Sequence, residues 1–207
     1  MKVDFILNRV KRVFDGDCSG HDYWHSFRVY KNAIKISQIE TCDKTVVAIA
    51  ALLHDVDDIK LFDTNNYSNA RNIMDEADID IAVQERVIDI IKEISFRGSE
   101  SVIPSTIEGK IVQDADRLDA MGAIGIARTF AFGGNKNRCI YDPDILPETN
   151  MNAEKYINNE GSSINHFYEK LFYLKNMMNT KMAKEIAESR DKYMRDYLEE
   201  FLKEWNE

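Results

Sequence analysis

The fold is decided by the stretch Lys44-Thr-Val-Val-Ala-Ile-Ala-Ala-Leu-Leu-His-Asp-Val56. Nearly every position is apolar and no turn signal interrupts the run, which predicts a helix buried on almost all sides. Near its end stand His54 and Asp55, whose side chains are costly to bury without a partner. A divalent cation shared with other side chains is the simplest compensation. We therefore expect a helical core with a metal site at the end of this helix.

The composition limits the class of protein. A chain of 207 residues can bury the core of one domain, and 44% hydrophobic and 30% charged residues are ordinary for a globular protein. Only three prolines and nine glycines leave little material for turns, which favours helices. The net charge of −9 argues against a nucleic-acid polymer as partner. A small phosphate ester stays open, because a metal and a few cations can reverse the sign inside a pocket.

The N-terminal segment and the cysteines indicate the compartment. Residues 1–10 are amphipathic and carry charges, and the sequence has neither a signal-peptide core nor a transmembrane run. Cys18, Cys42 and Cys139 are widely spaced without a CxxC pair, as expected for free thiols in a reducing cytosol. We expect a cytoplasmic protein with no membrane partner, and a homo-oligomer stays open.

Helical periodicity runs through the whole sequence and no strand is convincing. We expect helices at about 5–14, 22–40, 44–56, 70–76, 79–94, after a capping box at 105–108, at 118–132, 163–178 and 182–205. The pair Gly133-Gly134 should stop the seventh, and residues 133–152 should form a long loop. The prediction is an all-α, single-domain helical bundle over 1–207. Its metal-binding core is expected at about 20–130 and its C-terminal helices at about 160–205.

Three of the four histidines lie in two segments. His21 and His25 are four apart and share one helix face, which alone is a weak signal. His54 and Asp55 are about 100° apart on their helix, so one cation reaches both only at its edge. Other helices must then supply the remaining ligands.

The acidic cluster Gln113-Asp-Ala-Asp-Arg-Leu-Asp119 can supply one of them. Asp114 and Asp116 point to opposite sides of a helix, so only one is expected to be a ligand. Asp116 and Asp119 share a face, and the second can orient a histidine or a water. The alternative is a plain helical scaffold, with a hydrogen-bonded buried His54 and an exposed acidic turn.

These residues resemble the HD phosphohydrolase superfamily, whose pattern is a His, a His-Asp pair and a distant Asp. The matches are His25 in His-Ser-Phe-Arg-Val29, the pair in Leu-Leu-His-Asp55, and Asp116 in Ala-Asp-Arg-Leu118. The segments His21-Asp-Tyr-Trp-His25, 113–128 and 165–171 resemble a bacterial subgroup of predicted HD hydrolases. The resemblance implies an all-α bundle and one divalent metal held by His25, His54, Asp55 and Asp116.

The resemblance also implies a chemistry. Two imidazoles and two carboxylates suit Mn, Mg, Co, Ni or Fe, and the extra histidines of two-metal branches are not evident. Asp58 is the expected general acid or base, while His21 and Lys60 are expected to bind phosphate oxygens. The expected substrate is a nucleotide or similar small phosphorylated molecule, cleaved at an ester or a phosphoanhydride. The alternative is a non-catalytic metal or nucleotide sensor on the same fold.

Overall fold

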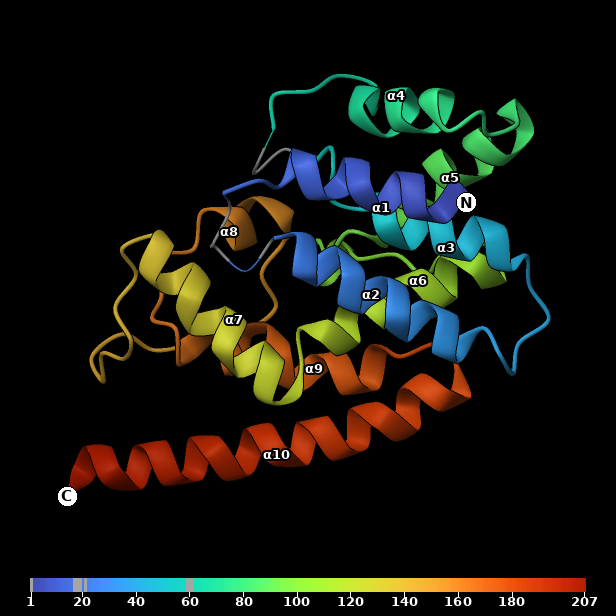
Figure 1. The fold of residues 1–207 in the computed structure, drawn as a ribbon. Helices are drawn as coiled ribbons and strands as arrows, with labels where there is room; N and C mark the ends of the chain where they lie inside the picture. Colours follow the sequence, from blue (N-terminus) through green and yellow to red (C-terminus); the bar gives the residue numbers. More distant parts are fainter. Residues whose placement is uncertain (1, 17–19, 21, 59–61) are drawn as a thin grey trace. The chain divides into compact units, whose positions relative to one another are not determined.

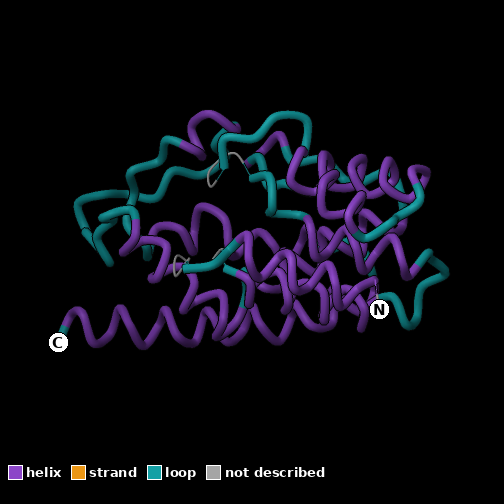
Figure 2. Tube along the Cα trace, turned by 45° about the horizontal axis from the view of Figure 1, so that its top comes forward, coloured by secondary structure: helices purple, strands orange, loops and turns teal. Residues whose placement is uncertain are grey.

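The computed structural model describes residues 2–16, 20, 22–58 and 62–207, apart from the side chain of Ile157. Every regular element in these ranges is a helix, which confirms the all-α class (Figure 2). No helix in these ranges has the length and hydropathy that crossing a bilayer requires. Contacts divide the chain into two compact units, Met1–Ser95 with Val102–Asp116 and Phe96–Ser101 with Arg117–Glu207. Each unit is described by itself.

The first unit is built around a central apolar helix, α3. Its helices are α1 (Lys2–Val13), α2 (Tyr23–Ile36), α3 (Lys44–Leu53), α4 (Ser68–Glu76), α5 (Ile81–Ile94) and most of α6 (Ile107–Asp119). Helix α3 packs against α1, α2 and α5 (Figure 1). All residues from Val46 to Leu53 are buried, as the unbroken apolar run predicts.

Helices α2 and α3 start at aspartate caps and end earlier than expected. The Asp43 carboxylate accepts hydrogen bonds from the N–H groups of Thr45 and Val46, and that of Asp22 accepts from His25 N–H. Helix α2 ends at Ile36 rather than near residue 40, and α3 ends at Leu53 rather than near residue 56. The chain therefore turns at residues 54–57, where the His-Asp pair lies.

The second unit contains the C-terminal half of the chain. Its elements are η1 (Gly98–Glu100), α7 (Gly122–Asn135), α8 (Ala153–Ile157), η2 (Phe167–Leu171), α9 (Phe172–Leu174), η3 (Lys175–Met177) and α10 (Lys181–Asn206). Helix α10 packs on α7. The helix expected at 163–178 is present as consecutive π, α and 3-10 turns between residues 165 and 177 rather than as one uniform α-helix.

The π turn η2 contains a buried carboxylate, Glu169. It accepts hydrogen bonds from Glu148 N–H at 3.2 Å and from Asn159 Nδ2 at 2.7 Å. Burial raises the pKa of Glu169, and these hydrogen bonds offset only part of that rise. The turn therefore directs a polar side chain inward to meet two loop segments.

The glycines of α7 have roles that the pattern did not predict. The expected helix at 118–132 is interrupted after Asp119 and restarts at Gly122, whose φ of +71° lies in the left-handed region. The pair at 133–134 lies inside α7 instead of ending it. A Cβ on Gly133 would lie 2.2 Å from Ser163 Oγ, whereas a Cβ on Gly134 would meet nothing within 4 Å. The lack of a side chain at Gly133 therefore allows Ser163 to pack closely against the helix, whereas a side chain at position 134 would meet no neighbour.

A second buried carboxylate, Asp191, lies on α10. It accepts hydrogen bonds from Arg195 Nε at 2.9 Å and Nη2 at 3.2 Å, and Lys175 Nζ lies 3.2 Å away. Burial alone would raise the pKa of Asp191, but the two cations outweigh it and hold the pKa below its ordinary value. The ion pairs tie α10 to η3.

Candidate functional site

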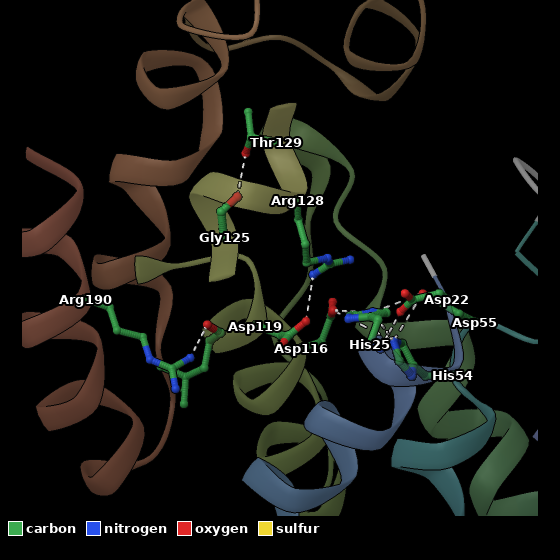
Figure 3. Close-up of polar contacts among 11 residues, drawn as sticks. Asp22, His25, His54, Asp55, Asp116, Asp119, Gly125, Arg128, Thr129 and Arg190 are labelled. Atoms are coloured by element: carbon green, nitrogen blue, oxygen red, sulfur yellow. Dashed lines mark hydrogen bonds and ion pairs between the residues drawn. The ribbon is translucent and has the colours of Figure 1, made fainter. Parts of the chain in front are cut away.

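The residues predicted as metal ligands meet within the first unit. His25 lies in the first turn of α2, His54 and Asp55 follow α3, and Asp116 lies on α6. One ligand atom each of His25, His54 and Asp116 lies within 4.8 Å of the other two. The four side chains point toward one another (Figure 3). Packing of α2 against α3 brings two of these segments together.

The distances are short. The Nε2 atoms of His25 and His54 are 3.1 Å apart. Asp55 Oδ2 lies 3.2 Å from the first of these nitrogens and 3.4 Å from the second. Asp116 Oδ1 lies 3.5 Å and 3.8 Å from them. Both carboxylates therefore face the same pair of imidazole nitrogens.

The hydrogen bond of His54 decides which ring nitrogen can bind a cation. Its Nδ1 lies 3.0 Å from the carbonyl oxygen of Ala51. A carbonyl only accepts, so the neutral ring carries its proton on Nδ1 and presents the lone pair of Nε2 to the cluster. A backbone carbonyl commonly orients a metal-binding histidine in this way. The scaffold alternative also predicts a buried His54 with a hydrogen bond to a backbone carbonyl. That hydrogen bond does not distinguish the two alternatives, because it leaves Nε2 available to bind a cation.

The cluster fits one divalent ion. Ligand atoms about 2.1 Å from an ion lie about 3.0 Å apart at adjacent octahedral positions and about 3.4 Å apart in a tetrahedron. Three of the five distances, 3.1, 3.2 and 3.4 Å, correspond to such separations, and the two from Asp116, 3.5 and 3.8 Å, are slightly longer. Two imidazoles and two carboxylates also supply the donor types that Mn, Fe, Co, Ni and Mg accept.

Exposure rises from the histidines to the acids. The side chains of His25 and His54 are 1% and 3% exposed, whereas those of Asp55 and Asp116 are 13% and 29% exposed. The imidazoles thus form the buried wall of the site. Water and a substrate can approach the cluster from the side of the carboxylates.

The remaining predicted site residues are placed only in part. Asp58 is half-buried, and its N–H donates to the carbonyl oxygen of Asp55 at 3.1 Å. It therefore shares the turn that carries the His-Asp pair. His21 and Lys60 lie outside the described residues.

The neighbouring Asp57 has a structural role that was not predicted. Its side chain is buried, and its two oxygens accept hydrogen bonds from Asn69 N–H at 3.0 Å and Ala70 N–H at 2.8 Å. Asn69 Nδ2 in turn donates to the carbonyl oxygen of Val56 at 2.7 Å. The start of α4 is thus anchored to the turn that bears the metal-type residues. The sequence signal was only an acid eleven residues upstream of a helix start.

The other acids of α6 are buried. Asp114 is fully buried and Asp119 is 2% exposed. In the second unit, Asp119 Oδ2 accepts a hydrogen bond from Arg128 Nη1 at 3.1 Å (Figure 3). Arg117 donates to the carbonyl oxygen of Met177. The exposed acidic turn of the scaffold alternative is therefore wrong for these two acids.

Comparison with known proteins gives one consistent family. The HD domain family matches residues 23–121. Bacillus subtilis YpgQ, an uncharacterized protein, is 39% identical over 204 residues, which cover 96% of this chain and 91% of YpgQ.

Solved structures agree with this match. A crystal structure of YpgQ in complex with ADP has a TM-score of 0.78 and covers 98% of this chain and 97% of its own. An HD-superfamily hydrolase from Bacillus thuringiensis is 42% identical, with a TM-score of 0.75 and coverage of 99% and 97%. A Lactobacillus plantarum protein is 36% identical, with a TM-score of 0.89 and coverage of 99% and 96%.

Proposed function

Because this chain belongs to the HD-domain superfamily of hydrolases, we propose that it is a metal-dependent phosphohydrolase acting on a nucleotide or similar small phosphorylated molecule. The observation that carries the proposal is the convergence of His25, His54, Asp55 and Asp116 at distances that suit one divalent ion. In the proposal these four residues hold that ion. Residues 1–207 are taken as one HD-type domain, since the matched stretch 23–121 includes residues of both compact units.

The ion, when bound, would lower the pKa of a water and offset the charge that develops on phosphorus. The two histidines form the buried side of the site and give it a fixed geometry, because His54 is held by a backbone carbonyl. The more exposed Asp116 borders the side from which a phosphate group enters. No serine or cysteine is needed as a nucleophile in this scheme.

Asp58 is assigned the proton transfer. It lies three residues after Asp55, its N–H donates to the carbonyl oxygen of Asp55, and its side chain is half-buried. His21 and Lys60 are proposed to bind phosphate oxygens, His21 by a ring N–H and Lys60 as a point charge. The charge of Lys60 would offset part of the chain's net charge of −9 where an anionic substrate binds.

A nucleotide is proposed as the substrate because YpgQ, at 39% identity, has been crystallised in complex with ADP. The donor set suits Mn or a similar divalent ion. Release of phosphate from a monophosphate and release of pyrophosphate from a triphosphate are both compatible with the site. The two reactions differ in the bond that the water attacks.

The test combines metal analysis with a substrate panel. Purified protein is assayed for bound metal, and its turnover of nucleoside mono-, di- and triphosphates with added Mn is measured as phosphate and pyrophosphate release. We expect one ion per chain and hydrolysis of at least one nucleotide class. Asp116→Asn should lose both, whereas Asp89→Asn, a carboxylate with 71% exposure on α5, should lose neither.

Two outcomes contradict the proposal in different ways. A protein that binds metal and nucleotide but turns over no nucleotide is a sensor. A protein without stoichiometric metal, in which Asp116→Asn behaves like Asp89→Asn, is a structural scaffold.

A further inference from the structure

An aromatic cluster covers the start of α2. Tyr23 and Phe27 stack with ring centroids 6.0 Å apart and an interplanar angle of 17°. Trp24 meets Tyr23 at 5.0 Å and Phe27 at 6.1 Å, with angles of 66° and 80°. Tyr30 continues the cluster, with its ring 6.3 Å from that of Phe27. The face of α2 that carries these rings is separate from its buried face, which carries His25 and Val29.

Trp24 is the open member of this cluster. Its side chain is 57% exposed, whereas Tyr23, Phe27 and Tyr30 are half-buried. Its contacts with Tyr23 and Phe27 are both edge-type, so neither of these neighbours lies parallel on the indole face. The two neighbours contact the indole on one side and leave much of its surface to solvent. An exposed aromatic side chain, with only two rotatable bonds, can stack on a flat ligand at little cost in conformational entropy.

Trp24 lies next in sequence to the cluster formed by His25, His54, Asp55 and Asp116. It directly precedes His25, so the two side chains leave α2 one residue apart and about 100° around the axis. Helical side chains tilt toward the N-terminal end of the helix, the end where His25 meets His54. A ligand whose phosphate lies at the cluster would therefore extend a flat group along the first turn of α2.

The surrounding charge suits an anionic ligand. Lys11 Nζ lies 5.9 Å from the ring centroid of Tyr23, and Lys31 Nζ lies 5.8 Å from that of Phe27. Both lysines are exposed, and they flank the aromatic cluster in a chain of net charge −9. Aromatic rings beside cations are the combination that binds bases together with their phosphates.

We propose that Trp24 stacks on the base of a nucleotide whose phosphate group lies at the His25 cluster, so that this residue sets the preference for nucleotides over other phosphate compounds. The inference rests on the proposed function, because it assigns the base end of the same ligand. It requires no base-specific hydrogen bond, so purines should bind more tightly than pyrimidines through their larger stacking area.

Fluorescence tests the contact directly, because the chain has only two tryptophans, Trp24 and Trp205. In Trp205→Phe all indole emission comes from Trp24, and in Trp24→Phe it comes from Trp205, whose side chain is 50% exposed. Each variant is titrated with adenosine monophosphate and with ribose 5-phosphate in the presence of Mg²⁺. Saturable quenching is expected only for Trp205→Phe with the adenine nucleotide.

Kinetics test the consequence. Trp24→Ala should raise the KM for a nucleotide roughly tenfold, the effect of losing one base stack, with little change in kcat. The KM for inorganic tripolyphosphate, which has no base, should stay unchanged. Trp24→Phe should retain most of the nucleotide affinity. Equal melting temperatures of the variants and the wild type exclude misfolding as the cause.

Three results overturn the inference. The first is calorimetric binding of a nucleotide to Trp205→Phe without quenching, which leaves the proposed function standing. The second is a Trp24→Ala variant without a selective effect on nucleotides, seen in either of two ways. In one, the KM for nucleotide and the KM for tripolyphosphate rise equally. In the other, the KM for nucleotide stays unchanged while the oligomeric mass changes, in which case the cluster is a surface for a second copy of the chain. The third is no calorimetric binding of any nucleotide, which rejects the inference together with the nucleotide part of the proposed function.

Discussion

Removal of the Asp57 carboxylate should destabilise the first unit, because α4 has no cap of its own. Its N-cap residue, Tyr67, is left-handed and makes no side-chain capping bond. The two oxygens of Asp57 instead accept the N–H groups of Asn69 and Ala70. In Asp57→Ala the N–H of fully buried Ala70 loses its acceptor, at a cost of about 1–3 kcal/mol. Loss of the second, part-buried bond adds about 0.5–1 kcal/mol, as for a lost cap.

We therefore expect Asp57→Ala to lower the free energy of unfolding by about 3 kcal/mol. Asp57→Asn keeps one acceptor oxygen and should lose about half as much. The control Asp63→Ala removes an exposed carboxylate from the same connection and should stay within about 0.5 kcal/mol of the wild type.

Urea unfolding followed by circular dichroism gives these free energies, measured with chelator present so that metal binding does not contribute. Amide hydrogen exchange at Ala70 locates the effect, since this N–H should be protected in the wild type and exchange faster in Asp57→Ala. The reasoning is refuted if Asp57→Ala matches the Asp63→Ala control, or if exchange at Ala70 is unchanged.

The other predictions concern the metal and the second unit. A divalent ion at a hundred times its Kd should raise the free energy of unfolding by about 2.7 kcal/mol, and His54→Ala should abolish the accompanying rise in melting temperature seen by calorimetry. Gly133→Ala should destabilise the protein by about 1–3 kcal/mol, because the added methyl group would clash with Ser163, whereas Gly134→Ala should be neutral or stabilising by up to about 1 kcal/mol. Chemical denaturation measures both effects. Asp191→Asn should cost about 1 kcal/mol at pH 7, a value reduced because Arg195 is half exposed. The low folded-state pKa of Asp191 makes its contribution fully present above the unfolded pKa of about 3.9. The difference from Asp191→Asn should therefore shrink as the pH falls below about 3.9 and vanish once the folded-state carboxylate is protonated, and a difference that does not change with falling pH would contradict this account.

The features that could be predicted from the sequence depend on local hydrophobic pattern and on ionisable side chains in an otherwise apolar segment. An unbroken apolar run can hardly form anything but a buried helix, so α3 was predictable. Buried ionisable groups need partners, so His54 and Asp55 indicated that further ligands must approach them. The pattern could not say which acid of α6 turns toward the histidines. The resemblance favoured Asp116, and the structure brings Asp116 to them.

The features that could not be predicted depend on contacts between distant segments. Gly133 is indistinguishable from a helix stop until Ser163 is known to pack against it. The π turn at 167–171 accompanies a buried Glu169, whose hydrogen-bond donors come from loops that carry no periodic pattern. The role of Asp57 could not be predicted because its donors lie twelve and thirteen residues away in the chain. In each case a tertiary partner decides the role of the residue.

The packing of the first unit implies that the cluster is formed by the fold rather than by the ion. His25 and His54 extend from α2 and from the end of α3, two helices that pack against each other and whose buried residues are mostly apolar. The His54 ring is held by the carbonyl of Ala51, which belongs to α3 itself. Asp57 fixes the following turn to α4 without any metal. An ion would therefore enter a largely preformed histidine wall, and its main structural effect should fall on the more exposed carboxylates of Asp55 and Asp116. Because the helices need no ion to pack, chelation should leave the helical content intact while abolishing turnover, in contrast to a structural zinc site, whose domain unfolds without its metal.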